Sequence, residues 1–286
     1  MQTANVKTDF VPDVETQLQF EELYDKNQVM KRLKQEFDIP EIKMHLTKNN
    51  IPVDFGIALM SQMVLHKRAT IKVLVGLLHR YFKDAANPFQ ECSYALVKAA
   101  EFNLVDYAAI GDTFILRPEV DVTQDVYDDL ARYQYPLPML IPPVEITKNN
   151  QSGYLRVQNS VILRDNHHED DVCLDHLNRV NRTRYTINLD TALMIKNSWE
   201  NLDKQKPGET LVEYRARIKA FHKYDTTSRD VIDHLVNMGN SFHLTHRYDK
   251  RGRTYCQGYH VTYQGNEWNK AVIEFANQEV CTSVNQ

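Results

Sequence analysis

Glycine and cysteine are scarce in this chain of 286 residues, which contains nine glycines and four cysteines. The low glycine content, with long runs of Leu, Met, Lys, Gln and Glu, favours a mainly helical protein with few strands. The cysteines lie far apart in the sequence, at Cys92, Cys173, Cys256 and Cys281. This spacing indicates reduced thiols rather than a disulfide framework, so we expect no bridges.

Long apolar runs are also missing. The longest, such as residues 71–78, are far shorter than the roughly 20 residues of a membrane span, so no membrane contact is expected. The N-terminus carries polar and acidic residues where a secretory signal has a basic region followed by an apolar one. These absences predict a cytoplasmic protein, in the cytoplasm of a bacterial host if the chain is viral.

Motifs of common enzyme sites are absent as well: we find no phosphate-loop glycine pattern, serine elbow or HExxH. One loose group of metal-ligand types spans residues 167–176. A structural zinc site usually presents two paired ligand sets, so we expect no metal in this chain. A metal-dependent hydrolase built on this group is the least favoured of three hypotheses.

Charge is unevenly distributed along the chain. The formal net charge of -4 is unusual for a protein that coats nucleic acid unaided, because binding to phosphates needs a local excess of Lys and Arg. Residues 119–130 carry five acids and no base, whereas residues 247–253 hold four bases against Asp249 alone. The basic segment near the C-terminal end is therefore the candidate contact with nucleic acid.

Hydrophobic periodicity predicts a series of helices with a few strands between them. Four prolines within residues 135–143 force an extended path and suggest a boundary. The predicted helices are Thr16–Phe37, a longer one through Phe82 that Asp54 caps, Asn87–Phe102, Thr123–Tyr133, Val172–Trp199 and a helix pair over Glu209–Ser241. The predicted strands are Phe114–Arg117 and Tyr154–Arg164, with short strands and a helix in the last segment.

The segment from Arg247 to Tyr255 places an acid, a glycine and several bases within nine residues. Gly252 permits a positive φ or a close approach of the backbone to a ligand. Arg251 and Arg253 carry forked donors that suit phosphate oxygens, and Asp249 is placed to hold one guanidinium. Tyr255 adds an aromatic face for stacking on a base or sugar. A solvated surface turn explains the same residues about equally well.

Context favours the binding interpretation, because three segments resemble the single-subunit RNA polymerases of phages and mitochondria in the same order. Residues 249–255 resemble the DxxGR motif, D-W-R-G-R-x-Y, and residues 263–266 with Lys270 are similar to the N-P-Q-G-N-D that follows it. Residues 139–143 and 153–154 are similar to the family's V-P-P and Gly-Gly-Tyr. Residues 180–188 resemble its N-x-A-Q-N-T-x-W-x-I-N helix. Lys250, Thr262, Tyr263 and Glu267 depart from the pattern.

The resemblance covers residues 135–275 and implies a role for each matched residue. Arg251, Gly252 and Arg253, with Asp249, Tyr255 and Lys270, would contact template near the RNA–DNA hybrid. Residues 214–242 look like a reduced thumb, with Arg215, Lys219 and Arg229 as hybrid contacts. The implied domains are an N-terminal helical domain (1–134), a Pro-rich connection with a strand and long helix (135–200), a thumb-like helix pair (201–243) and the opening of the palm (244–286).

In members of the family, the catalytic aspartates lie further along the sequence than the position that corresponds to Gln286. The resemblance therefore implies no catalytic residue in this chain. We expect one subunit of a heterodimeric DNA-directed RNA polymerase, inactive alone, which binds template DNA and the RNA–DNA hybrid. A second subunit would carry the fingers, the rest of the palm and the Mg²⁺ ions. The family also leaves room for an accessory recruitment factor. The alternative is a non-catalytic nucleic-acid-binding transcription factor derived from a polymerase fold.

Overall fold

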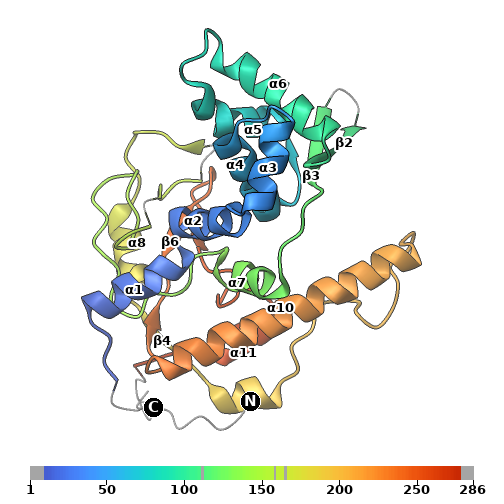
Figure 1. Cartoon of the computed structure of the whole chain (residues 1–286). Coiled ribbons are helices and arrows are strands. Elements are labelled where there is room, and N and C mark those ends of the chain that lie inside the picture. The colour runs from blue at the N-terminus through green and yellow to red at the C-terminus, as the bar shows by residue number, and fades with distance from the viewer. Residues whose placement is uncertain (1–9, 111–112, 158, 164–165, 278–286) are drawn as a thin grey trace, which may run out of the picture. The chain divides into compact units, whose positions relative to one another are not determined.

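The computed structural model describes residues 10–110, 113–157, 159–163 and 166–277 (Figure 1). Cys281 therefore lies outside the described residues, as do the start of the first predicted domain and the end of the last one. The chain is an α+β protein in which helices predominate, as the sequence predicts. It divides into two compact units, one made of residues 26–130 and the other of residues 1–25 and 131–286.

The unit of residues 26–130 is built around one buried helix, α4 (Val53–His66). Every residue from Phe55 to Leu65 is buried, because most of this helix is apolar and a small sheet and other helices cover it. The sheet is antiparallel in the order β1-β3-β2. The other elements are α2 (Lys26–Phe37), α3 (Pro40–Lys48), β1 (Ala69–Thr70), α5 (Ile71–Leu78), the 3-10 helix η1 (His79–Phe82), α6 (Pro88–Glu101), β2 (Val105–Ile110) and β3 (Thr113–Pro118).

Helix α7 (Gln124–Tyr133) spans the boundary between the units. The second unit holds a core of buried aromatic and aliphatic side chains that includes Phe242 and Trp268. Its elements are α1 (Val14–Tyr24), α8 (Leu174–Asn181), β4 (Arg184–Ile187), α9 (Leu189–Met194), α10 (Leu211–Asn237), β5 (Phe242–His243), β6 (His246–Tyr248), β7 (Thr254–Cys256), α11 (Glu267–Val272) and β8 (Ile273–Phe275). They form an antiparallel sheet in the order β5-β4-β8 and a hairpin, β6-β7.

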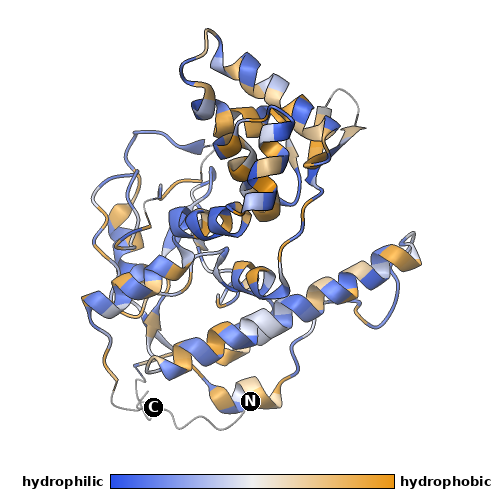
Figure 2. Ribbon diagram, in the orientation of Figure 1, coloured by the Kyte–Doolittle hydropathy of each residue, from blue (hydrophilic) through white to orange (hydrophobic). Residues whose placement is uncertain are grey.

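Helix α10 is 27 residues long and begins with a capping box, in which Thr210 and Glu213 exchange hydrogen bonds. Its buried residues all lie between Phe221 and Val236, so only its second half packs against the core. The first half is largely exposed, including Leu211 and Val212 at the start of the helix. Polar and apolar residues are mixed along α10 (Figure 2). The predicted helix pair over Glu209–Ser241 is therefore wrong, since one continuous helix occupies that range.

Two predicted long helices are interrupted. The helix Thr16–Phe37 breaks at Asp25, whose ψ of 119° is extended, because Phe20 and Tyr24 belong to one hydrophobic core and the apolar residues of α2 to the other. The helix through Phe82 breaks at Lys67, which has a φ of 60°. Strand β1 then pairs with β3, and Pro52 rather than Asp54 occupies the N-cap position.

Two further predictions are wrong because long-range contacts replace the local pattern. Val172–Trp199 is not one helix, since β4 lies in its middle and pairs with β5 and β8. Tyr154–Arg164 is not a strand: within its described residues, only Ile162 forms a bridge, to Tyr248. The helices Asn87–Phe102 and Thr123–Tyr133, the strand Phe114–Arg117 and the extended proline-rich segment are confirmed.

The side chain of Glu21 fixes α1 to its unit. Glu21 is fully buried, and its carboxylate accepts hydrogen bonds from the backbone N–H groups of residues 155, 156 and 157 at 2.8, 2.6 and 3.3 Å. The neighbouring buried Gln17 donates to Glu21 at 3.0 Å and accepts from the backbone N–H of Leu140 at 2.7 Å. These bonds use the N–H groups that a strand ladder over residues 154–164 would need.

Candidate nucleic-acid interface

A tight turn joins β6 to β7 and presents the predicted arginines. The strands pair Tyr248 with Thr254, so residues 249–253 form the loop between them. The backbone N–H of Gly252 donates to the carbonyl of Asp249 at 3.0 Å, and the N–H of Asp249 donates to the carbonyl of Arg253 at 2.9 Å. Gly252 has a φ of +76°, and a Cβ there would meet nothing within 4 Å. Glycine is therefore needed for the backbone conformation, and the space beside it is open.

One buried carboxylate orders both arginines. The Oδ1 atom of Asp249 accepts from the backbone N–H groups of Arg251 and Arg253 at 2.8 and 3.0 Å. Its Oδ2 atom accepts from the Nε atoms of the same arginines at 3.2 and 2.9 Å, and from Nη2 of Arg253 at 2.7 Å. Asp249 is only 8% exposed, whereas the side chains of Arg251 and Arg253 are 61% and 50% exposed. The guanidinium groups are thus held in place while they face solvent.

The hydrogen-bond partners of Asp249 favour the ionised form of its carboxyl group. Burial acts to raise the pKa of this carboxyl, but the backbone and side-chain hydrogen bonds from Arg253 outweigh burial and lower the pKa below its ordinary value. The carboxylate is therefore ionised at neutral pH and compensates part of the positive charge of the turn. The sequence predicted that Asp249 holds one guanidinium, and the structure shows that it holds two.

Tyr255 lies beside Arg253, whose guanidinium carbon is 5.3 Å from the centre of the tyrosine ring. The ring is 38% exposed. An exposed aromatic ring next to ordered guanidinium groups is the combination with which proteins contact single strands, through stacking and phosphate binding together. The structure therefore brings Asp249, Arg251, Gly252, Arg253 and Tyr255 together in one small surface.

Hydrogen bonds from polar side chains hold the β6-β7 hairpin in place. The imidazole of His246 is fully buried, and its two nitrogens lie 2.9 Å from Oδ1 of Asn181 and 2.8 Å from the hydroxyl of Tyr263. The side chain of Gln264 pairs with the backbone of β7, accepting from Cys256 N–H at 2.7 Å and donating to the Thr254 carbonyl at 3.0 Å. The segment 263–266 thus lies against the hairpin. His246 was not identified from the sequence as a residue that supports it.

We expect acid to destabilise the fold through two buried histidines. Burial lowers the pKa of His246 and of His260 from 6.5 to about 4, so both are neutral in the folded chain at neutral pH. Between pH 6.5 and 4 the unfolded chain binds the extra protons, so stability falls as the pH falls. The loss is up to about 1.4 kcal/mol per pH unit for each histidine. Thermal denaturation at pH 7 and pH 5 measures it.

Matched variants identify the groups responsible for that pH dependence. His246→Gln and His260→Gln should each flatten the fall in melting temperature between pH 7 and pH 5, whatever their effect at pH 7. His222→Gln, at an exposed position of α10, should leave it unchanged. A wild-type slope retained in both buried variants would contradict this assignment.

A cleft of about 740 Å³ opens beside the turn. Asp249, Lys250 and Gly252 line one wall, and His176 and Arg179 of α8 line another. The imidazole of His176 is 3.1 Å from the Thr254 hydroxyl, which links α8 to the hairpin. Sequence reasoning missed this wall, although the spacing of three residues between His176 and Arg179 places both on one helix face. The cleft extends the basic surface of the turn.

The other predicted contacts do not join this surface. Arg229 on α10 pairs with Asp225 at 3.2 Å and lies 5.3 Å from the ring of Trp268, so it links α10 to α11. Lys270 pairs with Glu267 at 2.8 Å and is half exposed. Arg215 and Lys219 are exposed on the first half of α10, four residues apart on one face. In the described part of the chain, no hydrogen bond or ion pair links any of these four residues to the turn.

Gly153 lies in close contact with residues from two other segments of the resemblance, 139–143 and 180–188, and with Thr245. A Cβ atom on Gly153 would lie 2.9 Å from Cβ of Pro143, 3.1 Å from Cγ2 of Thr245 and 3.4 Å from Nδ2 of Asn181. Residues far apart in the sequence are therefore in direct contact, and only glycine fits between them. These contacts place the proline-rich segment, α8 and the strand region before β6 around one point.

No protein-family model matches the chain, and no significant match to a curated protein was found. Among the residues that the structure describes, no helix is long and apolar enough to cross a bilayer. The same residues contain no group of three or more His, Cys, Asp or Glu side chains arranged to hold a metal ion. Within the loose group of metal-ligand residue types at 167–176, the imidazole of His167 forms hydrogen bonds with Ser160 and Glu169, and that of His176 with Thr254.

Proposed function

We propose that this chain is a subunit of a DNA-directed RNA polymerase that holds template DNA and the RNA–DNA hybrid. A second chain would supply the catalytic aspartates and the Mg²⁺ they bind. In this proposal, residues 1–134 belong to the N-terminal domain, 135–200 to its connection, 201–243 to a thumb and 244–286 to the opening of the palm. The DxxGR resemblance motivates the proposal, and the geometry of the turn supports it.

The observation that carries the proposal is the pair of arginines ordered by Asp249. Guanidinium groups fixed before binding lose less conformational entropy when they contact phosphates, and their forked donors match phosphate oxygens. Arg251 uses only its Nε in hydrogen bonds within the described part of the chain, which leaves both terminal nitrogens available. A solvated surface turn has no need of a buried carboxylate that holds two arginines outward.

The β5-β4-β8 sheet offers a surface to which a second chain could bind. Strand β8 pairs only with β4 among the described residues, so it is an edge strand. Beside it lies a groove of about 910 Å³ lined by Tyr185, Tyr263 and Phe275, whose rings stack at 5.8 and 5.6 Å between centres. Phe275 is 65% exposed. The proposal assigns this edge and groove to the polymerase partner.

Phe275→Asp is expected to weaken association with the partner chain by at least about tenfold, since it places a charge where an apolar contact is needed. Co-purification of the two chains from a common expression measures the effect. Phe89→Asp, at an exposed position of α6, is the matched control and should leave association intact. Equal loss in both variants, or in neither, would contradict the assignment of the sheet edge.

RNA primer extension on an RNA–DNA scaffold with Mg²⁺ and nucleotides tests the proposed function. The chain is assayed alone and after co-expression with the product of the neighbouring open reading frame. Extension that requires both chains would support the split polymerase. Extension by this chain alone would contradict the assignment of catalysis to a partner.

The second candidate is a non-catalytic nucleic-acid-binding transcription factor. One observation favours it: Asp249, a residue of the same turn, orders both arginines, and two ordered guanidinium groups can bind phosphates without any catalytic residue. Scaffold binding by the chain, with no extension in the presence of the partner, would favour this candidate.

A further inference from the structure

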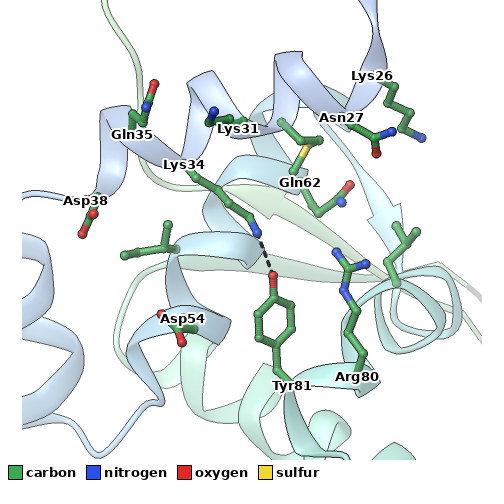
Figure 3. A pocket seen from close by; sticks show the side chains of 13 residues that line it. Lys26, Asn27, Lys31, Lys34, Gln35, Asp38, Asp54, Gln62, Arg80 and Tyr81 are labelled. Carbon is green, nitrogen blue, oxygen red and sulfur yellow. Dashed lines mark hydrogen bonds between the residues drawn. The ribbon is translucent and has the colours of Figure 1, made fainter. Parts of the chain in front are cut away.

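A basic pocket in the unit of residues 26–130 shares no residue with the surface described above. It has a volume of about 760 Å³ and is formed by α2, α4, α5 and η1 (Figure 3). Four cations line it against two carboxylates, and one of these, Asp38, already pairs with Lys43. The cations are Lys26, Lys31, Lys34 and Arg80. Within the described residues none of the four pairs with a carboxylate, so the pocket has an uncompensated positive charge.

Two of these cations, Lys34 and Arg80, lie beside Tyr81 in the pocket. Nζ of Lys34 donates to the hydroxyl of Tyr81 at 2.8 Å and lies 5.5 Å from the centre of its ring. The guanidinium of Arg80 is also 5.5 Å from that ring. A lysine held by a tyrosine hydroxyl keeps its full charge and has two remaining donors for a ligand. The arrangement positions charge without neutralising it.

Gln62 supplies an independent sign of a missing ligand. Its side chain is 6% exposed and lines the pocket, and its Oε1 atom is buried without a hydrogen-bond partner. Buried polar atoms are almost always paired, so an unpaired amide oxygen in a residue that lines a pocket points to a donor from outside the chain. Figure 3 shows the Gln62 amide and the Arg80 guanidinium on the same side of the hydrogen bond between Lys34 and Tyr81.

We propose that this pocket binds a nucleoside phosphate, with the phosphate on Lys31, Lys34 and Arg80 and the edge of the base against the Gln62 amide. An anion without an O–H or N–H group would satisfy the cations but would offer no donor to the amide oxygen, whereas the edge of a base offers one. The apolar side chains of Met30, Ile57 and Leu77 also line the pocket and suit the flat body of a base. A glutamine amide pairs well with a base edge that offers both a donor and an acceptor. This site is additional to the proposed polymerase role and does not depend on it.

The ligand chemistry is shared by free nucleotides and by nucleotides within a strand, so the test has two arms. Isothermal titration calorimetry measures binding of the four ribonucleoside triphosphates in one arm and of a single-stranded oligodeoxynucleotide in the other. The full chain is used throughout. The oligonucleotide arm is run in an Arg253→Ala background, so that the β6-β7 turn contributes little to the signal. Inorganic phosphate is titrated for comparison.

Gln62→Leu and Lys34→Met are the informative variants, and Lys72→Met, exposed and outside the pocket, is the matched control. We expect saturable binding in at least one arm, weakened tenfold or more by each pocket variant and unchanged by Lys72→Met. Gln62→Leu should keep the melting temperature of the wild type, because it removes an unpaired buried atom, so its loss of binding cannot be attributed to unfolding.

Binding in the first arm alone identifies a free nucleotide, and binding in the second alone identifies a strand. The proposal is overturned by absence of binding in both arms. It is also overturned if inorganic phosphate binds as tightly as the nucleotides, or if Gln62→Leu has no effect. None of these outcomes bears on primer extension, so this proposal and the polymerase proposal fail separately.

Discussion

Replacing Arg253 with alanine is expected to abolish RNA extension on a preformed RNA–DNA hybrid while leaving assembly of the two subunits intact. The guanidinium of Arg253 is half exposed and ordered by Asp249, so its removal takes away a prepared phosphate contact without exposing the core. Two charge-assisted hydrogen bonds are together worth about 3–6 kcal/mol, which is a loss of a hundredfold or more. Extension by the co-purified subunits measures the loss.

Two neighbouring changes sharpen this test. Arg251→Lys should also impair extension, since the forked contact is lost although the charge remains. Lys250→Ala is the matched control: Lys250 is exposed in the same turn and makes no hydrogen bond to Asp249 in the described part of the chain, so it should reduce extension far less. Extension by Arg253→Ala at the wild-type rate would contradict the role assigned to Arg253.

Glu21→Ala is expected to lower the free energy of unfolding by about 3–5 kcal/mol, among the largest effects of any single substitution in the chain. The change leaves three backbone N–H groups, of residues 155–157, without their acceptor, and it removes the partner of the buried Gln17 amide. Urea denaturation followed by circular dichroism measures the change.

The adjacent Glu22→Ala variant controls for the loss of a negative charge on α1. Glu22 is exposed and pairs with Arg156 at 3.5 Å, a surface contact worth about 0–1 kcal/mol. Glu21→Gln keeps an acceptor oxygen and should fall between the two variants. Equal stability of the Glu21→Ala and Glu22→Ala proteins would show that the carboxylate of Glu21 does not fix α1 to the unit.

The elements that the sequence predicted well are those set by local signals. Asn87 caps α6 by accepting from the N–H of Gln90 at 3.2 Å, so the start of that helix follows from an N-cap residue before a proline. The proline-rich path over residues 135–143 follows equally directly from the missing N–H groups.

The errors come from partners distant in sequence. Residues 184–187 continue the helical pattern around them, yet they form a strand because β5 and β8, more than 50 residues later, pair with them. The helix Thr16–Phe37 splits because its two halves pack into different cores, which periodicity cannot show. Backbone groups after Tyr154 bind Glu21, a side chain more than 130 residues earlier.

The candidate site was predicted as a set of residues but not as an arrangement. The types and spacing in residues 249–255 indicated a phosphate-binding turn, and the hairpin that presents them follows from the pairing of β6 with β7. The cleft wall from α8 was not predictable in the same way, because His176 reaches Thr254 across 78 residues. The unpaired amide of Gln62 has no signature in the sequence at all.

Crosslinking from the turn during RNA synthesis tests the central claim most directly. Benzoylphenylalanine is placed at Tyr255, the exposed ring beside Arg253, and at Tyr107 of β2 as an exposed control. After both subunits are assembled on an RNA–DNA scaffold and irradiated, we predict crosslinks from position 255 to the template strand or the RNA within the hybrid. Crosslinks from position 255 no more frequent than from position 107 would contradict the claim that this turn holds template and hybrid.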